Sequence, residues 1–366
     1  MRFRIEKLLI FVIVTRVLIL VLSWLTINLL YPELPHQLFL SFTSTAWNRW
    51  DAPHYLFLAH NWYTNVGDPA NFIVFFPLYP LILKLVISIM GNAALSGVFI
   101  SNIFFAIGCY FFYKLVSLNY SEEIAMRSVI VLAIFPTSYF FNAPYTESLF
   151  FLIFCVSLYA AQKENWILSG IFTGLGVITR PFGILLLPAI LTEWFLNKKR
   201  KLSSLPIIIL PSMLATYWYL YLNKTIYGNY FAFQKILTNN WQKHLSSPFK
   251  SILDSWHIAL GGGLTNFTIL VGWAESLTIS VAWILIPFAF KYLRKSWAVY
   301  YTLSIVLFSS TSFILSTPRY LLSIPPFFIL IALAQKNHLF KIIWGFTSVA
   351  LLFCLSILFA RGQWAF

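Results

Sequence analysis

Charged side chains are scarce in this chain of 366 residues, where they make up only 10% of the sequence. A soluble domain of similar length carries about 25% charged residues. Hydrophobic residues account for 60%, and long apolar runs such as Leu8–Leu30 recur along the chain. Runs of 18 or more apolar residues are long enough to cross a bilayer as helices. The composition therefore predicts an integral membrane protein.

Several other signatures are missing as well. The apolar runs are continuous rather than alternating, which argues against a membrane β-barrel. The three cysteines lie inside apolar runs without a C-x-x-C motif, and the histidines lack zinc-binding spacing, so we expect neither a metal nor a cofactor. The sequence contains no phosphate-binding P-loop and no G-x-S-x-G serine motif.

The apolar segments predict an all-α polytopic protein, with a single membrane domain over residues 1–366. We expect about eleven transmembrane helices (range roughly 10–13). Two long polar loops, at 32–71 and 223–264, are expected to be external. The first apolar stretch follows a basic start and is too long for a signal peptide, so we expect a retained helix with a cytoplasmic N-terminus.

The net charge of +14 is better explained by cytoplasmic loops than by nucleic-acid binding. Three basic clusters are predicted to be cytoplasmic: Lys198–Lys201, Lys291–Lys295 and Lys336–Lys341. This assignment places the following parts outside: Asn142–Glu147, Arg180, the second polar loop, Arg319 and the C-terminus. Counting forward from an external first loop puts Asn142–Glu147 on the opposite side. We therefore expect one segment between 72 and 141 to be re-entrant, or two to share one crossing.

Only eleven residues are acidic. Five lie beside basic residues or near cytoplasmic ends, and we interpret them as solvated charges: Glu6, Glu122, Glu123, Glu164 and Glu193. Glu33, at the start of a loop, is uninformative. Five remain as candidates for a functional role: Asp51, Asp68, Glu147, Asp254 and Glu275.

Asp51 lies in the stretch NRWDAPHYLFLAHNW, at residues 48–62. The pattern predicts a short interfacial helix with Asp51, His54 and Tyr55 on one face. One alternative is that Asp51 only caps this helix by accepting amide hydrogen bonds. A cap does not account for Arg49 and His54 beside it, however. A carboxylate with these neighbours favours a site that activates a hydroxyl and holds an anion.

Three further charged residues lie at predicted membrane depth, where they are costly and usually functional. Glu147 begins an apolar segment just after Pro144, where its charge also suits the start of a helix. Arg180 and Arg319 each lie beside a proline at the end of a span. Both arginines either snorkel to the membrane interface or bind a phosphate through the guanidinium group.

The segment Arg49-Trp50-Asp51-Ala52-x-His54-Tyr55, followed by Phe75-Phe76-Pro77, resembles the first-loop signature of the GPI mannosyltransferase II (PIG-V) family. Three later segments are similar to other motifs of that family, in the same order, so that the resemblance covers most of the chain: Tyr145–Phe150, Gly174–Gly183 and Pro318–Tyr320.

The resemblance implies a GT-C glycosyltransferase, which is polytopic and carries an external catalytic loop after its first helix. Such enzymes take a sugar, typically mannose, from a polyprenyl-phosphate carrier and invert the anomeric centre. The family's first-loop aspartate falls on Asp51, as a base or an acceptor-orienting carboxylate, and its next acidic residue corresponds to Asp68. Because Pro53 replaces an acidic residue of eukaryotic members, we expect an acceptor other than a GPI precursor.

We therefore predict an inverting hexosyltransferase with Asp51 as the catalytic residue. Its partners are a polyprenyl-phosphate sugar, a lipid, glycan or protein acceptor, and membrane lipids. The site is expected on the non-cytoplasmic face, of the plasma membrane in a prokaryote or the endoplasmic reticulum in a eukaryote. The residues expected to bind donor or acceptor are Arg49, His54, Tyr55, Asp68, Glu147, Arg180, Arg319 and Tyr320.

Two other functions fit the sequence. One is a transporter or flippase of a lipid-linked anion, and the other is a non-catalytic subunit of a glycosylation complex. Transporters often contain inverted repeats with paired broken helices near the middle of the membrane. Here the charged and broken positions gather on one predicted face, which favours catalysis at a surface.

Overall fold

The computed structural model describes residues 5–366, and these form helices and connecting loops, with one isolated β-bridge between Leu245 and Thr311. The all-α prediction is confirmed. The basic residues Arg2 and Arg4, on which the orientation of the N-terminus depended, lie outside the described residues.

Within residues 5–366, four helices are long and apolar enough to cross a membrane, and three bent helix pairs raise the count to as many as seven. About eleven spans were expected from the sequence. The difference arises because several apolar runs are broken before they reach membrane length. The apolar helix Glu147–Gln162, for example, has 16 residues. That helix is about 24 Å long, too short for a crossing of about 30 Å.

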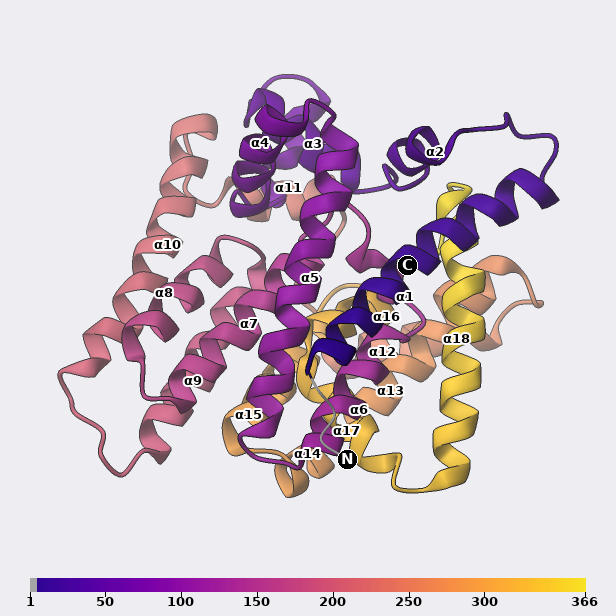
Figure 1. The fold of residues 1–366 in the computed structure, drawn as a ribbon. Helices are drawn as coiled ribbons and strands as arrows, with labels where there is room; N and C mark the ends of the chain where they lie inside the picture. Colours follow the sequence, from indigo (N-terminus) through magenta and orange to yellow (C-terminus); the bar gives the residue numbers. More distant parts are fainter. Residues whose placement is uncertain (1–4) are drawn as a thin grey trace. The chain divides into compact units, whose positions relative to one another are not determined.

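The helices are labelled in chain order in Figure 1. The chain divides into two compact units, which are described separately. The first unit comprises the residues up to Trp62, Pro77–Val156 and Ile331–Ala365. Its elements are α1 (Ile5–Leu30), α2 (Phe39–Ala46), α3 (Ala52–Asn61), α4 (Leu78–Met90), α5 (Ala93–Ser117), α6 (Glu122–Ala133), η2 (Ser138–Phe141), most of α7 (Glu147–Gln162) and α18 (His338–Ala360).

The second unit comprises Tyr63–Phe76, Ser157–Leu330 and Phe366. Its elements are η1 (Asp68–Val74), α8 (Trp166–Val177), η3 (Pro181–Leu185), α9 (Leu186–Leu196), α10 (Ser204–Tyr227), α11 (Ala232–Asn239), α12 (Pro248–Leu260), η4 (Thr268–Ala274), α13 (Glu275–Ile284), α14 (Ile286–Tyr292), α15 (Lys295–Ser309), α16 (Thr317–Tyr320), η5 (Leu321–Ser323) and the first part of α17 (Pro325–Ala334).

Short polar residues determine where several helices begin. Asn92 accepts a hydrogen bond from the Leu95 amide at 3.0 Å, and Asn165 accepts one from the Leu168 amide at 3.1 Å. These bonds satisfy amides that the first helical turn leaves without a partner. Ser121 and Asn337 cap α6 and α18 in the same way. The caps determine where α5, α6, α8 and α18 begin.

Glycines bring η3 close to α8 in the second unit. A Cβ atom added to Gly183 would lie 1.9 Å from the carbonyl oxygen of Gly176, so only glycine fits there. Gly170 and Gly174 similarly face the backbone of α10, because added Cβ atoms would lie 2.4 Å from the Ile207 oxygen and 2.8 Å from the Pro211 oxygen. This close packing fixes the backbone around Arg180, between α8 and η3.

Candidate functional site

The first group of predicted site residues surrounds the start of α3. We call Arg49, Asp51, His54, Tyr55 and Tyr145 the aspartate cluster. Asp51 occupies the N-cap position of α3, but its carboxylate makes no capping hydrogen bond. The alternative in which Asp51 only caps the helix is therefore not supported.

Tyr145 holds the backbone on both sides of Trp50. Its hydroxyl donates a hydrogen bond to the Arg49 carbonyl oxygen at 2.7 Å and accepts one from the Asp51 amide at 3.2 Å. Trp50 has a φ angle of 52°, in the left-handed region that bulky residues rarely adopt. Tyr145 thus stabilises a bend that sets the position of Asp51.

Aromatic rings surround Tyr55. The Tyr55 ring lies 5.4 Å from the Tyr79 ring and 6.3 Å from the Tyr145 ring. Tyr79, a residue that sequence reasoning did not single out, therefore packs against the aspartate cluster. Glu147 begins α7 two residues after Tyr145, and its side chain is fully buried.

His54 is half-buried one turn into α3. Burial lowers the pKa of its imidazole, and the Asp51 charge together with a hydrogen bond to the Asp51 backbone partly opposes this effect. The lowered pKa favours the neutral ring. A neutral imidazole can donate or accept one hydrogen bond beside Asp51 without adding a charge.

The aspartate cluster lies at the far end of α18 from a basic cluster. Lys336 and Lys341 flank the start of α18, whereas Trp364, beyond its other end, contacts Trp50 with ring centroids 5.3 Å apart. The hydrogen bonds from Tyr145 also bring the first-loop motif and the motif at Asn142–Glu147 together. The expectation of a re-entrant segment between 72 and 141 stays a prediction.

Three predicted residues, Arg180, Arg319 and Tyr320, lie in the second unit. We call these residues, together with Lys243 and Ser323, the arginine cluster. Arg180 is buried and donates a hydrogen bond to the Ser323 hydroxyl at 2.9 Å. Its guanidinium lies 5.7 Å from the Tyr320 ring centroid, the same distance as the Lys243 ammonium. Two cations therefore meet at one aromatic ring, which favours cation–π contacts.

Glu275 braces the turn before Arg319. Its buried carboxylate accepts hydrogen bonds from the amides of Ser316 at 2.5 Å and Thr317 at 2.7 Å. Arg319 itself is buried in α16. Because both Glu275 oxygens bond to the backbone, we interpret this carboxylate as a support for the turn.

A backbone clip positions Lys243 in the second polar loop. The Ser312 amide donates to the His244 carbonyl oxygen at 2.8 Å, and the Ser246 amide donates to the Ser310 oxygen at 3.2 Å. Lys243 is half-buried, and its ammonium also lies 5.2 Å from the Phe313 ring centroid. The sequence did not distinguish Lys243 from solvated lysines of this loop, because the clip joins segments far apart in the chain.

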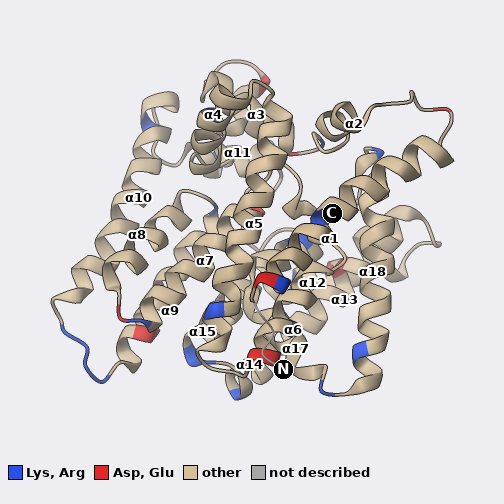
Figure 2. Cartoon of the chain, in the orientation of Figure 1, with Lys and Arg blue, Asp and Glu red and all other residues tan. Residues whose placement is uncertain are grey.

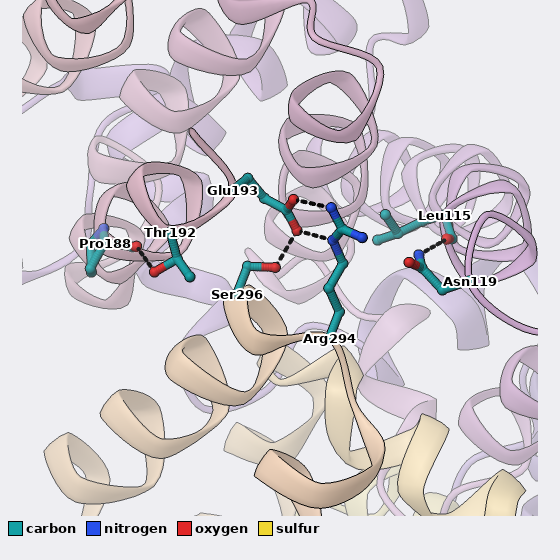
Figure 3. A network of polar contacts seen from close by, with 7 residues as sticks. All are labelled: Leu115, Asn119, Pro188, Thr192, Glu193, Arg294 and Ser296. Carbon is teal, nitrogen blue, oxygen red and sulfur yellow. Dashed lines mark hydrogen bonds and ion pairs between the residues drawn. The ribbon is translucent and has the colours of Figure 1, made fainter. Parts of the chain in front are cut away.

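Glu193 is not the solvated charge that the sequence suggested. It is buried, and its carboxylate accepts bonds from Arg294 Nε at 2.6 Å and Nη2 at 2.7 Å (Figure 3). This pair joins the end of α9 to the start of α15. Lys and Arg residues, coloured blue in Figure 2, lie in the segments next to these two ends. Phe182 contacts Phe308 near the other ends of α9 and α15. The arginine cluster thus lies opposite the basic end of the second unit.

Asp68 joins neither group through a described contact. It is exposed at the start of η1, and within residues 5–366 it makes no hydrogen bond or ion pair.

The described residues contain no group of three or more His, Cys, Asp or Glu side chains that could hold a metal ion. Two buried donors, Nε of Arg49 in the aspartate cluster and Nε1 of Trp364, have no hydrogen-bond partner among the described residues.

Arg16 is a structural residue that sequence reasoning also missed. It is buried in α1 and donates hydrogen bonds to the carbonyl oxygens of Ala133 and Ser138, the latter at 2.5 Å. The side-chain amide Nδ2 of Asn142 in turn donates to the Arg16 carbonyl oxygen at 3.0 Å. Irregular backbone at membrane depth needs such partners. Arg16 therefore supports the segment that leads to Tyr145, and its signal was a lone cation inside an apolar run.

The helical membrane architecture and the two polar clusters are consistent with a GT-C type glycosyltransferase. Residues 75–221 match the model of the dolichyl-phosphate-mannose-protein mannosyltransferase family. The searches of curated proteins and of solved structures gave no match. The matched range covers less than half of the chain but includes Tyr145, Glu147 and Arg180. It supports a glycosyltransferase that uses a polyprenyl-phosphate mannose donor. The finer PIG-V assignment stays a prediction, because its signature around Asp51 precedes the match.

Proposed function

We propose that the chain is an inverting glycosyltransferase that moves a hexose, with mannose as the first candidate, from a polyprenyl-phosphate carrier to an acceptor hydroxyl. The observation that carries this proposal is the Asp51 carboxylate, which is not used to cap α3 and lies on a backbone that Tyr145 holds. The match of residues 75–221 to a mannosyltransferase family supports the donor class.

In the proposed reaction, the oxygen of the acceptor hydroxyl attacks the anomeric carbon, and Asp51 takes the proton from that hydroxyl. The bond between that carbon and the phosphate oxygen breaks from the opposite side, and polyprenyl phosphate leaves with the bonding electrons. One general base is sufficient, because a phosphate leaves without protonation. Arg49, His54, Tyr55, Asp68 and Glu147 are proposed to bind donor or acceptor.

We assign the donor phosphate to the arginine cluster. Arg180 and Arg319 can bind phosphate oxygens in a bidentate manner, and Lys243 adds a third cation. An apolar cavity of about 280 Å³ is lined by Ile184 and Leu187, which follow Arg180 in the sequence, and by Met213 and Tyr217 of α10. This cavity is a candidate for part of the isoprenoid chain.

We further propose that both units belong to one membrane glycosyltransferase domain, active on the non-cytoplasmic face. The support is that each cluster lies at the opposite end of its unit from a basic cluster, and basic clusters mark the cytoplasmic side. The acceptor is proposed to be a glycolipid, glycan or protein other than a GPI precursor, because Pro53 replaces an acidic residue of the eukaryotic PIG-V members.

The test uses the full chain reconstituted in vesicles. Polyprenyl-phosphate mannose labelled in the sugar is supplied with pooled lipid, glycan or peptide acceptors, and a labelled nucleotide sugar serves as the control donor. We expect label to reach an acceptor only from the lipid donor, with an inverted anomeric centre by NMR. Movement of intact labelled donor across the bilayer without transfer would instead identify a flippase.

A further inference from the structure

We propose that Trp364 is a positioning residue for Asp51, acting through Trp50. The catalytic consequence rests on the proposed function, whereas the positioning of the backbone does not. The segment concerned is Arg361–Ala365, which follows α18 and belongs to the first unit.

The contacts of this segment converge on the first-loop motif. The Trp364 ring meets the Trp50 ring edge to face, with centroids 5.3 Å apart and an interplanar angle of 82°. Arg49 Nη2 lies 3.5 Å from the Ala360 carbonyl oxygen, and a Cβ atom added to Gly362 would lie 3.6 Å from the Arg49 guanidinium carbon. The segment therefore packs against the two residues that precede Asp51.

The segment is itself anchored to the first unit. Tyr139 donates a hydrogen bond to the carbonyl oxygen of Ala365, and the Arg361 guanidinium lies 3.9 Å from the Tyr31 ring centroid. Gly362 has a φ angle of 75°, which an L side chain rarely adopts, so the turn that brings Trp364 back towards Trp50 suits glycine. Contacts on both sides of Trp364 thus fix the indole in place.

Two independent contacts therefore hold the bend at Trp50. Tyr145 bonds to its backbone through the Arg49 carbonyl and the Asp51 amide, and Trp364 packs on its side chain. A left-handed φ at a tryptophan persists only where the surroundings determine it. If Trp364 is removed, the bend can relax and Asp51 shifts, although the carboxylate itself is unchanged.

The experiment compares Trp364→Ala with Trp364→Phe, which keeps an aromatic edge. Trp344→Ala is the matched control. Trp344 is half-buried like Trp364, but it lies near the start of α18 and stacks on Phe135. We expect Trp364→Ala to lower kcat between about tenfold and a hundredfold with donor KM nearly unchanged, since misplacing a catalytic group has costs of that order. Trp364→Phe should recover most of the loss, and Trp344→Ala should keep kcat.

Hydrogen exchange supplies a readout that does not need activity. Trp364→Ala should speed amide exchange in the peptide containing Trp50 and Asp51, and adding Trp50→Ala should produce little further change because both act on one bend. Unchanged exchange there, or equal loss of kcat in Trp344→Ala, would overturn the proposal. Absence of transfer by the wild-type protein would count against the proposed function alone, since the exchange result stands by itself.

Discussion

The aspartate cluster and the arginine cluster differ in what their supporting bonds do. In the aspartate cluster, Tyr145 bonds to backbone atoms on both sides of Trp50, and the Asp51 carboxylate is not used as a helix cap. In the arginine cluster, the cations of Arg180 and Lys243 meet at Tyr320, and the buried carboxylate of Glu275, outside the cluster, bonds to the backbone of the turn before Arg319. One cluster presents a carboxylate, and the other presents positive charge.

This difference corresponds to the two demands of the proposed reaction. A hydroxyl needs a base to take its proton, whereas a phosphate leaving group needs cations as its charge develops. Changes in the aspartate cluster should therefore act mainly on kcat, and changes in the arginine cluster mainly on the donor KM.

Asp51→Asn should have the largest effect. The amide cannot accept the proton, so we expect kcat to fall by roughly 10² to 10⁴ with donor KM little changed. Label transfer in vesicles measures both constants. Glu33→Gln is the control, because Glu33 is an exposed carboxylate of the same first loop and is not one of the proposed site residues. A comparable loss in both variants would show that Asp51 has no special role.

Arg180→Gln should raise the donor KM by about tenfold to a hundredfold, because a charge-assisted hydrogen bond contributes about 1.5–3 kcal/mol. Steady-state transfer at several donor concentrations measures this change. The exposed Arg200 provides the matched control, and Arg200→Gln should leave KM as it is. If KM is also unchanged in Arg180→Gln, phosphate binding by this arginine is wrong.

Tyr145→Phe removes one hydroxyl that makes two backbone hydrogen bonds, each contributing about 0.5–1.5 kcal/mol. We expect kcat to fall roughly fivefold to a hundredfold while the ring contacts remain. Tyr301→Phe also removes a buried hydroxyl, which bonds to the Ala282 carbonyl in the second unit. That variant should lose some thermal stability but retain kcat, and a similar kcat loss in both would contradict local positioning.

Lys243→Gln should raise the donor KM about threefold to tenfold, less than Arg180→Gln, because Lys243 is half-buried and solvent screens its charge. The difference from wild type should shrink as salt is added. Lys250→Gln, in the same loop, is the control, since Lys250 is exposed and pairs with Asp254. An increase in KM that is insensitive to salt would argue against an electrostatic role.

His54→Gln should produce the smallest change, and mainly below neutral pH. Burial lowers the pKa of His54 below its ordinary value of 6.5, so in acid the unfolded chain takes up a proton before the folded protein does. Stability from this group is complete above pH 6.5 and falls as the pH drops towards the folded pKa. Thermal unfolding between pH 7.5 and 5 should show a smaller acid loss in His54→Gln; an equal loss would assign it to other groups.

The sequence predicted the helical segments and α3 because these depend on local patterns. Pro53 in the first turn and the apolar faces required no long-range information. Asn and Ser caps likewise act within a few residues. The number of spans was less predictable, since the point at which a run such as 72–90 breaks depends on what packs against it.

Within the site, the sequence identified charged residues but not the neutral groups that hold them. Tyr145 meets Arg49 across 96 positions, and nothing in either local pattern indicates that contact. Glu193 was misjudged because its partner Arg294 is 101 positions away. Arg16 was visible as a lone charge, yet its role depends on the irregular backbone of Ala133–Asn142, which the sequence did not show.

The division between the two clusters is tested most directly by measuring kcat and donor KM for Asp51→Asn and Arg180→Gln, on the same labelled polyprenyl-phosphate mannose and in the same vesicles. The account predicts that the loss appears in kcat for Asp51→Asn and in donor KM for Arg180→Gln. Transfer by Asp51→Asn at the wild-type kcat, with the folded protein confirmed by thermal unfolding, would contradict it.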